Sequence, residues 1–185
     1  MSDSLDSIEF IDSTTMALSR RLRFDPDKGL EVLLYISNRI VNKDLYWVLK
    51  APYVADKYHL AEAARLICGD TYYAMKDGPV PGGLYDLIKD VRDRRRSPHS
   101  DKAQAAFRIE GNKIIPRRDA NPEVFSKTDI ECLDRAIKEI GHLSFDTLKK
   151  RTHDAAYDSA DANGEMLLEA IVKTLPEGEL ILDAA

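Results

Sequence analysis

The stretch "GDTYYAMKDGPVPGGLYDLIKD", residues 69–90, decides the fold of this chain. Pro79 and Pro81 push the residues before them towards extended conformations, so "DGPVPGG" cannot be helical. The preceding "DTYYAM" carries aromatic residues that favour an extended strand. An apolar spacing typical of helices resumes from Leu84. We therefore predict a rigid corner that leads into the N-terminus of a helix.

Apolar periodicity predicts helices on both sides of this corner. Asp25 can cap the first helix and Pro26 suits its first turn, with Val41 expected on its apolar face. Pro52 lies within the second helical pattern, which must either kink there or end and begin again. Ser126 is expected to cap a later helix. The expected helical segments are 24–42, 43–67, 83–96, 126–141, 144–157 and 164–175.

One hairpin is expected among these helices. In "AFRIEGNKIIPRR", residues 106–118, apolar and polar residues alternate around Gly111-Asn112, a suitable two-residue turn. Residues 97–104, "SPHSDKAQ", are interpreted as a surface linker. The fold class is therefore mainly α: a compact helical domain with a small β-hairpin. We expect an N-terminal arm at 1–21, the helical domain at 22–175 and a C-terminal tail at 176–185.

Composition narrows the function classes. The chain has 185 residues, of which 44% are hydrophobic and 32% charged, as is typical of soluble globular proteins. The net charge of −5 argues against sequence-independent nucleic-acid binding. The acidic start does not resemble a signal peptide, and no apolar run reaches the roughly 18 residues that span a membrane. We expect a cytoplasmic protein with no membrane partner, in which Cys68 and Cys132 are core residues.

No cofactor or metal motif is recognisable. The glycines near Pro79 have neither the spacing and lysine of a P-loop nor a GxGxxG pattern. Acid–base or metal chemistry would fall to a small set of residues, but no ligand motif such as HExxH accompanies them. We interpret His59 and His153 as buried, hydrogen-bonded groups that join helices, and predict no catalytic residue, cofactor or metal. The set consists of Asp56, His59, Asp70, His142, His153 and Asp154.

Aromatic residues beside the prolines suggest a preformed apolar surface. Tyrosine is common at protein interfaces, but it can equally pack a corner against the core, and both roles are open for Tyr72, Tyr73 and Tyr85. A second apolar cluster lies among polar residues near the N-terminus. The candidate partner-binding residues are Ile8, Phe10, Ile11, Tyr73 and Tyr85.

Four segments, taken in order, resemble the Panacea domain of SocA-like antitoxins. They are "GLEVLLYISNRI", "LKAPYVADKYHLAE", "GDTYYAMKDGPVPGGLYDLIK" and "LDRAIKEIGHLSFDTLKKRTHDAAY", and the resemblance extends over about residues 22–172. The combination of "Y-x-A-x-K-x-GPV" with "ADKYHLA" is specific. Two positions depart from the family: Pro52 replaces a usually apolar residue, and Asp77 stands where an aromatic residue is common.

The resemblance implies a bacterial or phage antitoxin that neutralises a cognate protein toxin by direct binding. It implies no enzymatic activity and leaves the oligomeric state unknown. The alternatives are a phage or prophage regulatory module with the same fold, and an enzyme that uses His153 and Asp154. The residues expected to define the fold are Asp56, His59, Asp70, Tyr72, Gly78, Pro79, Pro81, His142 and His153.

Overall fold

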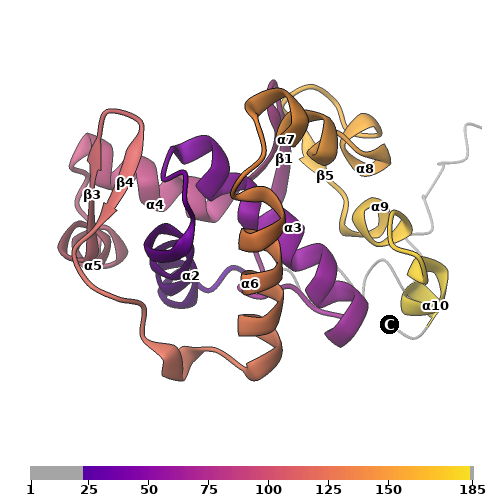
Figure 1. The fold of residues 1–185 in the computed structure, drawn as a ribbon, viewed down its shortest axis with the longest axis horizontal. Coiled ribbons are helices and arrows are strands. Elements are labelled where there is room, and N and C mark those ends of the chain that lie inside the picture. The colour runs from indigo at the N-terminus through magenta and orange to yellow at the C-terminus, as the bar shows by residue number, and fades with distance from the viewer. Residues whose placement is uncertain (1–22, 184–185) are drawn as a thin grey trace, which may run out of the picture.

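The structure, a computed structural model, describes residues 23–183 and is mainly helical (Figure 1). Helix α3 (Leu45–Ala63) crosses the centre, and α6 (Lys127–Ile140) packs along it. The other helices are α2 (Pro26–Arg39), α4 (Gly82–Asp93), α5 (Pro98–Ala106), α7 (Phe145–Thr152), α8 (Ala155–Asp158), α9 (Leu168–Lys173), α10 (Gly178–Asp183) and the 3₁₀ turn η1 (Pro122–Val124). The expected fold class, mainly α with a small hairpin, is confirmed over this part of the chain.

Local capping signals explain where α2 and α6 begin. The Asp25 side chain accepts a hydrogen bond from the Lys28 amide at 3.0 Å, and Pro26 follows it. Ser126 and Asp129 form the reciprocal capping box of α6. The prediction for Val41 was wrong: α2 ends at Arg39, so this side chain lies beyond the helix and is 86% exposed.

Helix α3 continues through Pro52 as one element. The second alternative, in which one helix ends at Pro52 and another begins, does not occur. Pro52 itself is buried, so its ring contributes to the packing of the helix although it cannot donate a backbone hydrogen bond. The helix ends at Ala63, and the next residue, Ala64, caps it with a φ of 50° in the left-handed region.

Two antiparallel sheets accompany the helices. The expected hairpin is present as β3 (Phe107–Glu110) and β4 (Lys113–Pro116), with Ile109 opposite Ile114. The corner forms a second hairpin, in which β1 (Tyr72–Met75) pairs with β2 (Gly78–Pro81). The other edge of β1 pairs with β5 (Glu165–Met166), giving a three-stranded sheet in the order β2-β1-β5.

Three further local predictions were wrong, and one of them is the single helix expected at 144–157, because α7 ends at Thr152 and α8 begins at Ala155. The expected linker at 97–104 is mostly helical: the Ser97 hydroxyl caps α5 by accepting a hydrogen bond from the Ser100 amide at 3.1 Å. The expected helix at 164–175 begins later, because Met166 is drawn into β5 and only Leu168–Lys173 is helical. A local cap at Ser97 explains α5, whereas pairing with β1 explains the later start of α9.

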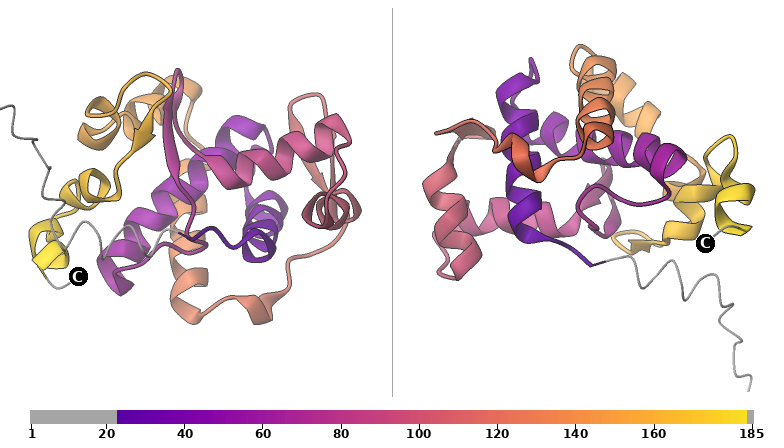
Figure 2. Two further views of the ribbon diagram at one scale, coloured as in Figure 1. Left: turned by 180° about the vertical axis from the view of Figure 1, so that it is seen from behind. Right: turned by 90° about the horizontal axis from the view of Figure 1, so that it is seen from below.

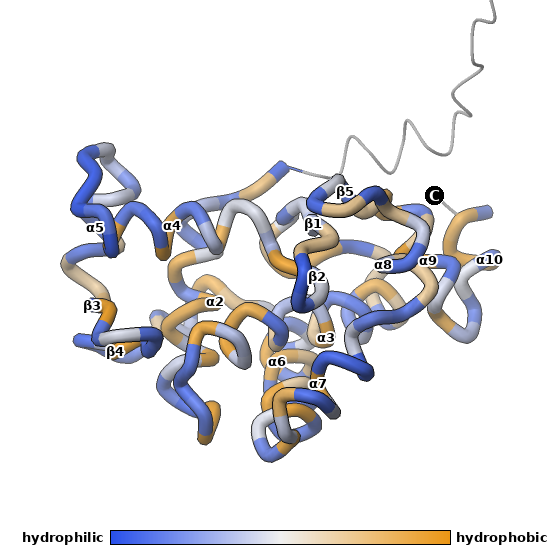
Figure 3. The backbone as a smooth tube through the Cα atoms, turned by 90° about the horizontal axis from the view of Figure 1, so that it is seen from above, coloured by the Kyte–Doolittle hydropathy of each residue, from blue (hydrophilic) through white to orange (hydrophobic). Residues whose placement is uncertain are grey.

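Apolar side chains gather in two adjoining cores. The larger core lies among α2, α3, α4 and α6, and includes the buried cysteines Cys68 and Cys132. The smaller core joins Tyr53 and Tyr72 to α9 and to Leu182 of α10, and these helices lie at one end of the molecule (Figure 2). Apolar and hydrophilic stretches alternate along the helices, as expected where one helix face is buried (Figure 3).

Candidate functional site

Asp70 fixes the corner to the start of α4. Pro81, the residue before this helix, offers no side-chain cap. The buried Asp70 carboxylate instead accepts hydrogen bonds from the amides of Gly83 at 2.8 Å and Leu84 at 2.9 Å. Burial raises the pKa of Asp70, although these backbone hydrogen bonds oppose the shift. The side chain therefore caps a helix that lacks a cap of its own.

Asp56 connects α3 to β1. Its buried carboxylate accepts hydrogen bonds from the Tyr72 hydroxyl and from the Ile67 amide, each at 2.7 Å. Burial raises the pKa of Asp56 to about 6, even though both hydrogen bonds favour the ionised form. The Tyr72 ring is buried in the smaller core, where it contacts the ring of Tyr53. Tyr72 is thus a core residue rather than a surface one.

His59 joins α3 to α6 through Asp129. Its Nδ1 lies 2.8 Å from the carbonyl oxygen of Arg65, and its Nε2 lies 2.9 Å from Oδ1 of Asp129. Asp129 also accepts hydrogen bonds from Lys28 at 2.6 Å and from Arg65 at 3.1 Å. Although burial opposes ionisation, the close approach of His59 and the hydrogen bond from Lys28 hold the pKa of Asp129 well below its usual range. Sequence analysis predicted the cap at Ser126 but did not single out Asp129.

His153 and Asp154 end one helix and begin the next. The His153 ring lies 3.9 Å from that of Tyr157, and burial, together with the nearby Lys149 and Lys50, lowers its pKa. The Asp154 carboxylate caps α8 and accepts a hydrogen bond from Lys57 at 2.6 Å. His142 is different, since it is exposed in the turn between α6 and α7 and lies apart from these groups.

Gly78 and Pro79 bring the turn of the β1–β2 hairpin close to α3. Gly78 has a φ of 104°, and a Cβ atom there would lie 2.9 Å from Oγ1 of Thr152 and 3.2 Å from Cε of Lys50. The Lys50 ammonium donates a hydrogen bond to the carbonyl oxygen of Pro79 at 2.8 Å. Pro81 is buried at the end of β2. Sequence reasoning overlooked Lys50, because a lysine within a helical pattern is usually exposed.

Two neighbouring hollows open beside the β1–β2 hairpin, and Tyr85 lines both. The first, of about 400 Å³, lies between α3, the β1–β2 turn and the β3–β4 turn. The second, of about 430 Å³, is also lined by Tyr73, whose side chain is 37% exposed. We call this surface, defined by Tyr73, Tyr85 and the two hollows, the Tyr85 face. The other candidate residues, Ile8, Phe10 and Ile11, lie outside the described part of the chain.

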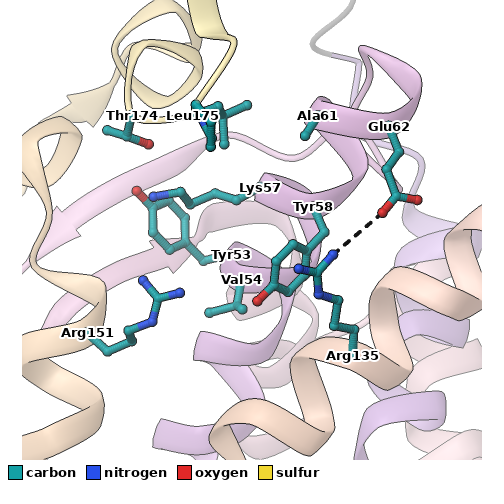
Figure 4. Close-up of a pocket in the computed structure, with 11 residues that line it drawn as sticks. Tyr53, Val54, Lys57, Tyr58, Ala61, Glu62, Arg135, Arg151, Thr174 and Leu175 are labelled. Atoms are coloured by element: carbon teal, nitrogen blue, oxygen red, sulfur yellow. Dashed lines mark ion pairs between the residues drawn. The ribbon is translucent and has the colours of Figure 1, made fainter.

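A separate hollow of about 380 Å³ lies between α3, α6, α7 and the end of α9 (Figure 4). Three cationic side chains line it, and each already has an acidic partner: Arg135 lies 3.7 Å from Glu62, while Lys57 and Arg151 pair with Asp154 and Glu139. Arg135 also covers the ring of Tyr58 at 3.7 Å. Because each cationic side chain of this hollow is paired with a carboxylate, the hollow has no excess charge that would favour a charged ligand.

Within residues 23–183, no group of three or more His, Cys, Asp or Glu side chains is placed to hold a metal ion. The helices described in this range are too short or too polar to cross a membrane.

The comparison with protein families agrees with the resemblance seen in the sequence. A family model described as "Antitoxin SocA-like, Panacea domain" matches residues 48–157, which include most of α3, the corner, the β1–β2 hairpin and α4 to α7. The resemblance is confirmed over that range. No curated protein and no solved structure matches the chain.

Proposed function

The chain belongs to the family of SocA-like antitoxins with a Panacea domain, and we propose that it neutralises one cognate protein toxin by binding it directly. In this proposal it acts in the cytoplasm as one half of a bacterial or phage toxin–antitoxin system. The family match, which includes more than half of the chain, is the observation that carries the proposal. The activity requires a specific protein interface and no chemical step.

The Tyr85 face is the best-supported candidate for that interface. Aromatic side chains contribute large contact areas at a low cost in conformational entropy, and interface centres are often hollows that receive a partner's side chain. Tyr73 and Tyr85 flank the second hollow and stand on a corner that Asp70 holds rigidly. A surface that is rigid before binding loses less entropy when a partner docks.

The contacts of Asp154 fit a structural role. Its carboxylate caps α8, pairs with Lys57 and accepts hydrogen bonds from the Tyr53 hydroxyl at 2.9 and 3.0 Å. These contacts occupy the Asp154 carboxylate in joining α3 to α8. We therefore propose a binding role for the protein rather than a catalytic role for Asp154.

Co-expression with the protein encoded by the adjacent gene tests the proposal. We expect the neighbour to arrest growth when produced alone, growth to resume when this protein is added, and the two proteins to purify as one complex. A toxic neighbour that is neutralised without forming a complex would contradict direct binding. A neighbour with no toxicity would contradict the antitoxin role.

Replacing Tyr85 with alanine should weaken toxin binding by about tenfold or more, because truncating a central interface aromatic costs roughly 1–2 kcal/mol or more. The measurement is the dissociation constant by calorimetry, with the melting temperature recorded for each variant. Leu180→Ala is the control, since Leu180 is an exposed apolar side chain on α10. Equal affinities for the wild type and Tyr85→Ala would remove the Tyr85 face from the interface.

A further inference from the structure

Lys50 is a buried cation with few partners. The residue is 2% exposed, and an ammonium group has three N–H donors. Among the described residues, one acceptor lies within hydrogen-bonding distance, the carbonyl oxygen of Pro79 at 2.8 Å. The ring of Tyr46 lies 5.0 Å away and offers a weaker cation–π contact. No carboxylate from this part of the chain neutralises Lys50 directly.

The hollow beside Lys50 has an excess of positive charge and of hydrogen-bond donors. Lys50, Lys76 and Arg92 line it, whereas Asp77 is the one acidic side chain among its lining residues. Asp77 is already paired with Lys149 of α7 at 2.8 Å. This excess contrasts with the net charge of −5 of the whole chain.

Tyr46 is another of the residues that line the hollow, and its buried hydroxyl has no hydrogen-bond partner within residues 23–183. Buried polar groups normally have partners, and an exception calls for an explanation. An incoming acceptor would explain both the Tyr46 hydroxyl and the free donors of Lys50.

We propose that this hollow receives a carboxylate of the protein partner, an acidic side chain or the chain terminus, which pairs with Lys50. This inference rests on the proposed function and identifies the chemistry of one contact. The apolar walls formed by Leu45, Leu49 and Val80 suit the carbon atoms that carry the carboxylate. A nucleic-acid phosphate fits less well, because the chain as a whole is acidic.

Protonation of Lys50 is then coupled to binding. Burial, together with Lys149, lowers the pKa of Lys50 to about 7, although Asp77 opposes the shift. The charged or titratable groups that face the site are Tyr46 on α3, Lys76 and Asp77 on the β1–β2 turn, Tyr85 and Arg92 on α4, Lys149 on α7, and His153 just after α7. A carboxylate beside Lys50 favours the charged amine, so binding above the free pKa must take up a proton. Affinity for a carboxylate should therefore fall about tenfold per pH unit above that pKa.

The experiment uses acetate as the probe and the full-length protein labelled with carbon-13 at the lysine side chains. The lysine Cε resonances are followed against pH in sodium acetate and in sodium chloride of equal ionic strength, and Lys50→Met assigns the Lys50 signal. We expect acetate to raise the pKa of Lys50 by about one unit or more, as an opposite charge nearby does. Equal pKa values in the two salts would overturn the carboxylate site. A rise in sodium phosphate without one in acetate would also overturn it and would assign the hollow to phosphate.

A second measurement separates this inference from the proposed function. Toxin binding is measured by calorimetry at about pH 8, above the free pKa of Lys50, in two buffers with different ionisation enthalpies. We expect proton uptake in the wild type, its loss in Lys50→Met together with about tenfold weaker binding, and no change in Lys138→Met, which alters an exposed lysine of α6. A complex with no proton uptake and unchanged Lys50→Met affinity would overturn the carboxylate contact while leaving toxin binding intact. Failure of the wild type to bind would overturn the proposed function instead, and the acetate titration would still decide the carboxylate site.

Discussion

Replacing Asp129 with alanine should lower the free energy of unfolding by about 3–5 kcal/mol, the range observed when one partner of a buried ion pair is removed. The Asp129 side chain is 0% exposed, and it accepts hydrogen bonds from Lys28 at 2.6 Å and from the Ser126 amide at 2.9 Å. The His59 side chain is also 0% exposed, and its Nε2 lies 2.9 Å from Oδ1 of Asp129. The substitution would leave these donors without an acceptor and disconnect α2 and α3 from the start of α6. Denaturant unfolding followed by circular dichroism measures the loss.

Asp134→Ala is the matched control for this prediction. Asp134 lies on the same helix, but it is exposed and accepts one hydrogen bond, at 2.8 Å from the Tyr35 hydroxyl. Its removal should cost about 1 kcal/mol. Equal losses for the two variants would show that the buried network contributes little.

The pH dependence of Asp129 has a definite sign. Because its pKa is lowered in the folded state, its contribution to stability is present above the unfolded pKa of about 3.9 and is lost as the pH falls through the folded value. The destabilisation caused by Asp129→Ala should therefore shrink in acid.

Replacing Gly78 with alanine should cost about 2–5 kcal/mol, the sum of backbone strain and overpacking. At a φ of 104°, the new Cβ would lie 2.9 Å from Oγ1 of Thr152 and 3.2 Å from Cδ2 of His153. These atoms belong to the end of α7, so the hairpin turn would be pushed away from that helix. Thermal unfolding measures the loss, and an unchanged melting temperature would mean that the turn is a free loop.

Gly111→Ala is a control in which the packing part of this effect is missing. Gly111 also has a positive φ, 59°, but no atom would lie within 4 Å of its Cβ. Alanine there should cost about 1–2 kcal/mol from the left-handed conformation alone. The larger cost expected at Gly78 therefore reflects both its packing against α7 and its φ of 104°, which lies outside the left-handed region that alanine tolerates.

Signals confined to neighbouring residues made much of the fold predictable. Asp25, Ser126 and the turn at Gly111-Asn112 act within three residues of their own positions, so the sequence displayed them directly. Helix α5 carried the same type of signal, Ser97 followed by Pro98, but the weak apolar pattern of the segment concealed it. Strand β5 carried no such signal, because its two residues are extended only through pairing with β1.

Long-range contacts explain what the sequence could not show about the site. Lys28 and Asp129 are far apart in the chain, and nothing in the sequence around either residue indicates that the two form an ion pair. Lys50 looked like an ordinary helix-surface residue until the hairpin turn placed Pro79 over it. The sequence also left open which tyrosines are buried. In β1, Tyr72 faces the core and Tyr73 faces outward, since successive strand residues face opposite sides.

Hydrogen exchange of the backbone amides, measured on the protein alone and in complex with its toxin, shows where the two proteins meet. We predict slower exchange in the complex for the β1–β2 turn and for the part of α4 around Tyr85, with α9 and α10 unchanged. Slower exchange confined to α9 and α10, with the β1–β2 turn and α4 unaffected, would contradict binding through the Tyr85 face.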